Sequence, residues 1–272
     1  MKETRVFILD GGTLVIDGFH IYWNRGPAGE VRFPVYSVLI DHADGLYLFD
    51  TGFDCDHVNA VLPFEKPLQS ERQTLPGALA LAGYRADDVD YVVNSHYHFD
   101  HCGGNRHLRE ACTVCHALEF AQCAAPAPFE LLGYSDMSFH ADLYRAKVAR
   151  EGRAVPDDPE SDIWTPRVEL LSGDQEIARG LHLIETPGHT AGHYSLLVEL
   201  AGRRPMLFTA DAAYTRKGLE QEIIPSFHLD PVKAVASMKR LKDVAVERDA
   251  EIFVGHDADA FAGYATAPAF YS

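Results

Sequence analysis

The sequence predicts a single α/β domain, and three observations support this prediction. Strand-like apolar segments recur along the whole chain, helical patterns lie between several of them, and the composition is that of a globular protein. Hydrophobic residues make up 47% of the 272 residues and charged residues 24%, so the chain can bury a sizeable core. We therefore expect strands and helices to pack in layers within one domain over residues 1–272.

Eight segments have the apolar or alternating pattern of β-strands. They are residues 6–9, 35–40, 46–49, 91–93, 181–185, 194–198, 206–209 and 252–254. Two helical patterns lie between them. Asp230 can cap a helix over residues 231–248, where Pro231 suits the first turn and apolar residues recur at helical spacing. A helix over residues 75–83 can end at Gly83.

Charge and hydropathy limit the classes of function. The net charge of −16 argues against a nucleic-acid partner, which requires a basic surface. The apolar stretch 6–9 is too short for a signal peptide, and the sequence lacks the run of about 18 apolar residues that crosses a membrane. Five irregularly spaced cysteines favour reduced thiols and a cytoplasmic location. Residues 144–165 are expected to form an exposed excursion from the domain.

The segment after the predicted strand 91–93 carries most of the chemistry. It reads His96-Tyr97-His98-Phe99-Asp100-His101, so four of six consecutive residues are of metal-binding types. Imidazole together with carboxylate suits Zn, Fe, Mn or Co. A polar turn with solvent-facing histidines is the alternative, but the HxHxDH spacing at a strand end favours a metal site.

Three other predicted strands also end in metal-binding residue types. Residues 181–185 lead into Thr-Pro-Gly-His189, residues 206–209 lead into Asp211, and residues 252–254 lead into Gly-His256-Asp257. The carboxyl ends of strands are where α/β sheets bind their ligands. Asp211 or His256 alone would be an ordinary polar strand terminus, whereas the set of four strand ends predicts one shared site.

HxHxDH, TPGHTAGH, the strand-end Asp211 and the late Gly-His-Asp together resemble the metallo-β-lactamase superfamily, from about residue 35 to residue 257. The resemblance implies an αββα sandwich with two divalent metal ions, expected to be zinc, in a groove at one edge. It also implies seven ligands, three for one ion, three for the other and one that bridges both: His96, His98 and His189; Asp100, His101 and His256; and Asp211.

An aspartate at the bridging position departs from the antibiotic-hydrolysing branch with a cysteine ligand and resembles the lactonases and glyoxalase II. Tyr214, three residues after Asp211, resembles the tyrosine with which acyl-homoserine lactonases contact the ester, although a plain packing role is the alternative. The family mechanism is attack of a metal-bridging hydroxide on a cyclic ester. Asp100 and Tyr214 are the expected catalytic residues, since Tyr214 can stabilise the oxyanion and Asp100 can pass a proton to the alkoxide.

Longer runs, among them WNRGPAGEVRFPVYS, VLPFEKP and FTADAAYT, resemble the 4-pyridoxolactonases of bacterial vitamin B6 degradation. They imply a small-molecule lactone partner, 4-pyridoxolactone, which is opened to 4-pyridoxic acid. An N-acyl-homoserine lactonase that quenches quorum signals is the alternative. Residues 1–34 are expected to lie partly as a loop on the substrate side. The candidate substrate-binding residues are Trp23, Arg25, Phe64, Lys66, Phe227 and His228.

Other interpretations fit fewer residues. The run from Cys112 to His116 matches a haem-attachment pattern, but export is not expected. A di-iron redox protein would need a flavin-binding domain, for which the chain leaves no room, and a phosphodiesterase of nucleic acids would need a basic segment. His193 is expected behind the ligands and Cys102 as a buried thiol. The sequence is compatible with a homo-oligomer.

Overall fold

The computed structural model describes residues 3–153 and 163–272. Their strands form one sheet in the order β1-β2-β3-β4-β5-β6 and a second in the order β11-β10-β9-β8-β7. The first sheet contains β1 (Arg5–Asp17), β2 (Glu30–His42), β3 (Gly45–Phe49), β4 (Tyr91–Val93), β5 (Cys112–His116) and β6 (Val168–Leu171). The second contains β7 (Gln175–Ala178), β8 (Leu181–Glu185), β9 (Tyr194–Val198), β10 (Met206–Phe208) and β11 (Glu251–Phe253).

Helices connect the strands and cover the sheets. The α-helices are α1 (Gly18–Ile21), α2 (Cys55–Val61), α3 (Leu75–Ala82), α4 (Phe99–Cys102), α5 (Ala117–Ala124), α6 (Ala141–Arg150), α7 (Arg216–Gln221), α8 (Pro231–Glu247) and α9 (Ala258–Phe261). The 3-10 turns are η1 (Pro63–Glu65), η2 (Glu71–Gln73), η3 (Ala86–Asp88), η4 (Gly103–His107), η5 (Pro128–Glu130), η6 (Gly133–Ser135) and η7 (Ala210–Ala212).

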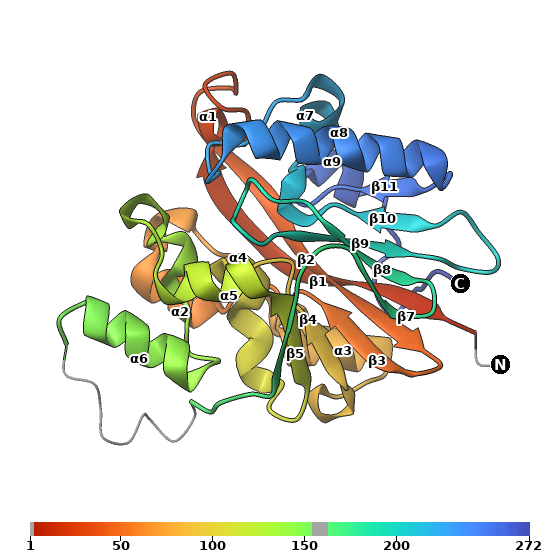
Figure 1. Cartoon of the computed structure of the whole chain (residues 1–272), viewed down its shortest axis with the longest axis horizontal. Helices are drawn as coiled ribbons and strands as arrows, with labels where there is room; N and C mark the ends of the chain where they lie inside the picture. The colour runs from red at the N-terminus through yellow and green to blue at the C-terminus, as the bar shows by residue number, and fades with distance from the viewer. Residues whose placement is uncertain (1–2, 154–162) are drawn as a thin grey trace.

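The alternation of side chains along β1 shows how the layers form. Val6 and Ile8 point into the core between the two sheets, whereas Phe7 and Leu9 pack with Leu79 of α3 on the outer face of the first sheet. On the outer face of the second sheet, the strands pack against Leu241 of α8. Figure 1 shows α8 running along the second sheet beside β10 and β11. The order of layers is therefore helix, sheet, sheet, helix, which confirms the expected αββα sandwich.

All eight predicted strands and both predicted helices are present, although their lengths differ. Side-chain oxygens of Asp230 accept hydrogen bonds from the backbone amides of Val232 and Lys233 and cap α8. Gly83, with φ of +88°, ends α3. β1 and β2 are much longer than predicted, because they pair as one antiparallel hairpin, from Arg5 opposite Asp41 to Asp17 opposite Glu30.

The structure describes parts of the two segments that were expected to be irregular. The N-terminal stretch 1–34 is mostly strand in its described part, and only residues 18–29 form α1 and the turns that follow it. The expected excursion over 144–165 begins within α6, which ends at Arg150. Residues 154–162 of that excursion lie outside the described residues. None of the helices among the described residues combines the length and apolar character needed to cross a bilayer.

The topology brings the strand ends together. β10 is parallel to β11 and antiparallel to β9, which is antiparallel to β8, so β8, β10 and β11 all end at the same edge of the second sheet. β4 of the first sheet ends beside this edge, since the backbone amide of Tyr194, at the start of β9, donates to the carbonyl of Ser95. The segments that follow these four strands therefore meet at one place.

Candidate metal centre

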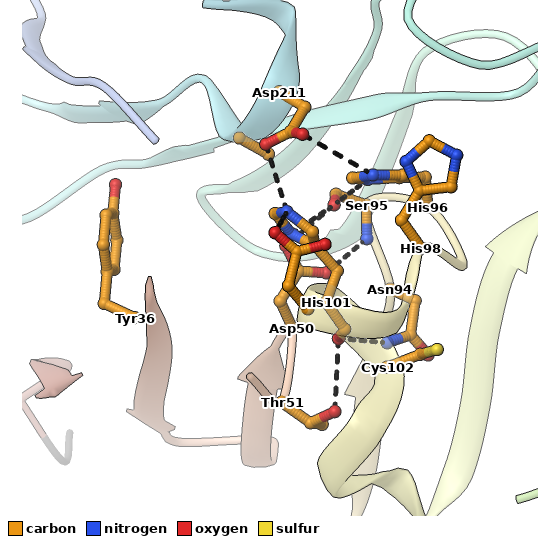
Figure 2. A network of polar contacts seen from close by, with 12 residues as sticks. Tyr36, Asp50, Thr51, Asn94, Ser95, His96, His98, His101, Cys102 and Asp211 are labelled. Atoms are coloured by element: carbon orange, nitrogen blue, oxygen red, sulfur yellow. Dashed lines mark hydrogen bonds and ion pairs between the residues drawn. The ribbon is translucent and has the colours of Figure 1, made fainter. Parts of the chain in front are cut away.

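The residues predicted as metal ligands gather at this edge in two groups. The first ligand group consists of His96, His98, His189 and Asp211, and the second consists of Asp100, His101 and His256. Within each group, one ligand atom per residue lies within 4.8 Å of all the others. Figure 2 shows His96, His98 and His101 coming from the segment after β4, with Asp211 facing them from the second sheet.

Asp211 lies between the two groups and presents one carboxylate oxygen to each. Its Oδ2 lies 3.1 Å from Nε2 of His189 and 3.8 Å from Nε2 of His96. Its Oδ1 lies 3.1 Å from Nε2 of His101 and 2.9 Å from Nε2 of His256. This geometry is that of a carboxylate that can bridge two cations.

Contacts behind the centre orient four of the histidines. In each, Nδ1 contacts an oxygen outside the centre, which turns Nε2 towards it, the arrangement typical of metal-binding histidines. The Nδ1 contacts are His96 with Ser95 Oγ (2.9 Å), His101 with Asp50 Oδ2 (2.8 Å), His189 with the Phe227 carbonyl (2.7 Å) and His256 with the Pro34 carbonyl (2.9 Å). His98 instead directs Nδ1 inward, 3.0 Å from Nε2 of His189.

The two groups differ in electrostatics. In the first, burial lowers the pKa of His98 and of His189 to about 3, so both imidazoles are neutral, the state in which they bind metals. In the second, burial also opposes protonation, but the carboxylates of Asp211 and Asp100 outweigh it and hold the pKa of His101 and of His256 above the usual value. Positive charge is therefore stabilised in the second group.

The residues present fit a pair of metal ions. Nε2 of His96, of His101 and of His256 and Oδ1 of Asp211 are buried, and although they lie close to one another they form no hydrogen bond with the described residues. Buried polar atoms normally have partners, so unpaired atoms that face one another across the centre indicate a place for bound cations. Nitrogen with carboxylate oxygen is a donor set that suits zinc and related divalent ions.

Sequence reasoning missed Asp50, which lies directly behind the ligands. Its carboxylate contacts Nδ1 of His101 and accepts hydrogen bonds from the amide and the hydroxyl of Ser95, both at 2.7 Å. Figure 2 shows Asp50 close to His101 and Ser95. The signal was available, because Asp50 directly follows the predicted strand 46–49 and is thus another carboxylate at a strand end.

Glu119 on α5 was also missed, and it joins two ligand-bearing loops. Its Oε1 accepts hydrogen bonds from the amide of Tyr97 (2.9 Å) and the hydroxyl of Tyr134 (2.8 Å), whose ring packs edge-on against His98. Gly192, in the loop of the other ligands, packs so closely that a Cβ there would lie 2.4 Å from the Glu119 amide. A glutamate in a short helix carries no sequence signal for this role.

A cavity of about 360 Å³ opens over the centre. Tyr214 lines it beside the ligands, with its ring edge-on to His256 at 4.8 Å between centroids. Burial, helped by the charge of Asp211, raises the pKa of the Tyr214 phenol well above its usual value, so the hydroxyl remains protonated. The other lining side chains outside the ligands are Ile16, His20, Phe33, Leu62, Phe64, Glu65, Phe99, Phe129, Glu130, Leu132, Ser226, Phe227 and His228.

The structure places only half of the candidate substrate-binding residues at this cavity. Phe64, Phe227 and His228 line it. Trp23 does not; it packs against the ring of His228 from outside, with 4.5 Å between centroids.

Arg25 and Lys66 also lie away from the cavity. Arg25 is exposed in the turn after α1, where its backbone amide donates to the carbonyl of Tyr22. Lys66 forms an ion pair with Glu30 on the outside of the molecule. Residues adjacent in sequence to the cavity wall thus point elsewhere because the turns that carry them reverse the direction of the backbone.

His193 and Cys102 are not among the groups that could hold an ion. His193 is fully buried and accepts a hydrogen bond from the backbone amide of Asp211 at 3.2 Å, which helps to place that carboxylate. Cys102 is a buried free thiol. Cys112 and Cys115 belong to the interior strand β5, which gives the haem-attachment pattern no exposed site.

Comparisons with known proteins agree with this geometry. N-acyl homoserine lactonase AttM of Rhizobium radiobacter is 30% identical over 279 residues, covering 100% of both chains. N-acyl homoserine lactonase AiiA of Bacillus thuringiensis subsp. kurstaki is 28% identical over 269 residues, covering 95% of each. A solved N-acyl homoserine lactone hydrolase with the product N-hexanoyl-L-homoserine at its catalytic metal centre superposes with a TM-score of 0.79 at 25% identity, over 100% of both chains.

The sequence profile of the metallo-beta-lactamase superfamily matches residues 31–256, from β2 to the final ligand His256. This match covers most of the chain and both ligand groups. The chain belongs to the metallo-beta-lactamase superfamily.

Proposed function

We propose that the chain is a metal-dependent hydrolase that opens a lactone ring. The observation that carries this proposal is the position of Asp211 between two ligand groups, with Tyr214 beside them on the wall of the cavity. The similarity to named lactonases over the whole chain supports it. His96, His98, His189, Asp100, His101, His256 and Asp211 are proposed to hold two divalent ions, with zinc as the proposed metal.

Tyr214 and Asp100 have distinct parts in this reaction. When bound, a pair of divalent ions acidifies water and polarises the ester carbonyl. Tyr214 remains a hydrogen-bond donor because its pKa is raised, so it can stabilise the charge that develops on the carbonyl oxygen. Asp100 lines the cavity, so its carboxylate can accept the proton that the attacking water loses and deliver it to the leaving alkoxide.

The comparisons favour one of the two candidate lactones, and the cavity has features that suit either. The relatives named above act on N-acyl homoserine lactones, and these comparisons favour that substrate over 4-pyridoxolactone. The exposed apolar side chains of Phe64, Phe129 and Leu132 at the cavity could contact an acyl chain. 4-Pyridoxolactone remains the second candidate, because the cavity is compact and several of its walls are aromatic rings.

The test is a comparison of kcat/KM for 4-pyridoxolactone and for short-chain and long-chain acyl-homoserine lactones, using metal-reconstituted protein. We expect one class to be preferred by about a hundred-fold or more, which would identify the substrate. Tyr214→Phe should lower kcat by about ten- to a hundred-fold with metal content unchanged, because it removes one oxyanion donor. Metal-loaded protein that hydrolyses no lactone would refute the proposal.

A further inference from the structure

Most polar side chains on the cavity wall, apart from the metal centre and Tyr214, already have partners within the protein. Oε2 of Glu130 contacts the side-chain amide of Gln122 and accepts from a backbone amide, whereas its Oε1 is buried without a hydrogen-bond partner among the described residues. His228 directs Nδ1 at the Pro225 carbonyl, 2.9 Å away, and the hydroxyl of Ser226 donates to a backbone carbonyl at 3.3 Å. These groups are therefore engaged in holding the wall itself.

Glu65 differs from them. It ends η1, it is half-buried, and it lines the cavity together with Asp100 and Tyr214. Within residues 3–153 and 163–272, its carboxylate makes no hydrogen bond and no ion pair. Among the polar side chains that line the cavity outside the metal centre and Tyr214, His20 also has no hydrogen bond to the described residues, but it is exposed, with its ring against Phe227.

The neighbouring cation, Lys66, is unavailable to Glu65. Lys66 has a left-handed backbone conformation with φ of +44°, and its ammonium group pairs with Glu30 outside the cavity. The guanidinium of Arg32 donates to the Lys66 carbonyl at 3.1 Å and stabilises this turn. The backbone turn therefore directs these adjacent side chains apart, so that the carboxyl of Glu65 lies at the cavity and the ammonium of Lys66 lies at the surface.

An unpaired carboxyl among apolar walls gains energy from any hydrogen-bond donor that reaches it. Burial raises the pKa of Glu65 to about 7, and the nearby charge of Asp100 adds to this, which supports its isolation from other donors. The substrate is the group that enters this space during the reaction. A donor on the substrate is thus the partner that the wall lacks.

We propose that Glu65 is a specificity-determining residue that accepts a hydrogen bond from an N–H or O–H group of the substrate, beside the lactone ring that is opened. This inference rests on the proposed lactonase function. Both candidate substrates carry such a donor, the side-chain amide N–H of an acyl-homoserine lactone and the ring hydroxyl of 4-pyridoxolactone. Lactones without a donor are therefore expected to be poorer substrates.

The test compares lactones with and without the donor on wild-type, Glu65→Gln and Glu65→Leu proteins. N-hexanoyl-homoserine lactone is matched by α-heptyl-γ-butyrolactone, which has a chain of the same length on the same ring carbon but no N–H. 4-Pyridoxolactone is matched by phthalide, which has a fused aromatic ring but neither hydroxyl nor nitrogen. For whichever donor-bearing lactone is the substrate, we expect Glu65→Leu to lower kcat/KM by about ten- to a hundred-fold, mainly through KM. We expect a smaller loss for Glu65→Gln, and less than about a two-fold change for the matched lactone without a donor.

Glu30→Gln is the matched control, because it makes the same chemical change at a carboxylate that pairs with Lys66 outside the cavity. It should leave both kinds of lactone unaffected. Three results would each overturn the role of Glu65. They are an equal loss of kcat/KM on both kinds of lactone, no loss on either kind, and a fall in the metal content of Glu65→Gln. If the wild-type protein opened neither kind of lactone, the proposed function itself would fail, which is a separate outcome.

Discussion

The two ligand groups of the metal centre lie side by side but hold charge differently. In the first, His98 and His189 are kept neutral by burial, with a pKa of about 3. In the second, Asp100 and Asp211 raise the pKa of His101 and His256 despite burial, so protons are retained there. The first group can accept a cation without losing protons, whereas the second must exchange protons for it. The difference teaches that one shared carboxylate can serve two sites of different proton affinity.

The largest effect is expected from removing the shared carboxylate. Asp211→Ala should lower lactone hydrolysis by about a thousand-fold or more and leave fewer than two metals per chain, since both groups lose a ligand. Metal analysis after reconstitution and initial-rate assays measure this. His98→Ala and His256→Ala are matched controls that should each weaken one group only. An Asp211→Ala protein that still bound two metals would show that the two groups do not depend on a shared carboxylate.

A pH titration of metal binding should sharpen the contrast. The retained protons of His101 and His256 are lost as pH rises, so the affinity of the second group should increase by up to about ten-fold per pH unit for each proton released. The first group should show little change above about pH 5, because its imidazoles are already neutral. Chelator competition on His98→Ala and on His256→Ala separates the two groups. If metal affinity changed equally with pH in the two variants, the two groups would not differ in the protons that they retain.

The smallest effect is expected on the free energy of unfolding, from a substitution of Glu119, which orders the loops around the first group. Burial raises its pKa to about 7. Its contribution to the free energy of unfolding is therefore fully present below the unfolded pKa, near 4.5, and is lost as pH rises through about 7. Glu119→Gln cannot ionise, so its stability relative to the wild type should rise by up to about 3 kcal/mol from pH 4 to pH 8. Urea unfolding of the metal-free proteins measures this, and a pH-independent difference would contradict it.

The residues of the two ligand groups could be predicted from the sequence because each follows a short strand whose pattern is local. β4, β8, β10 and β11 are recognisable as apolar runs, and in an α/β sheet their ends must converge. Other elements lack such a signal. β6 and β7 contain exposed residues on a sheet edge, and α5 and α6 are short helices with mixed faces. Their formation depends on packing against the rest of the fold, which a local pattern does not record.

The sequence alone predicted which residues gather at the centre, which carboxylate lies between the two ligand groups, and that Tyr214 stands close by. The tertiary structure decided what surrounds this centre. It placed Glu65 at the cavity and turned Lys66 away, and it brought Glu119 against two loops distant in the chain. The physical reason is that ligands at strand ends converge through backbone hydrogen bonding of regular strands. The cavity wall is instead assembled from turns, whose side-chain directions depend on backbone torsions and long-range contacts.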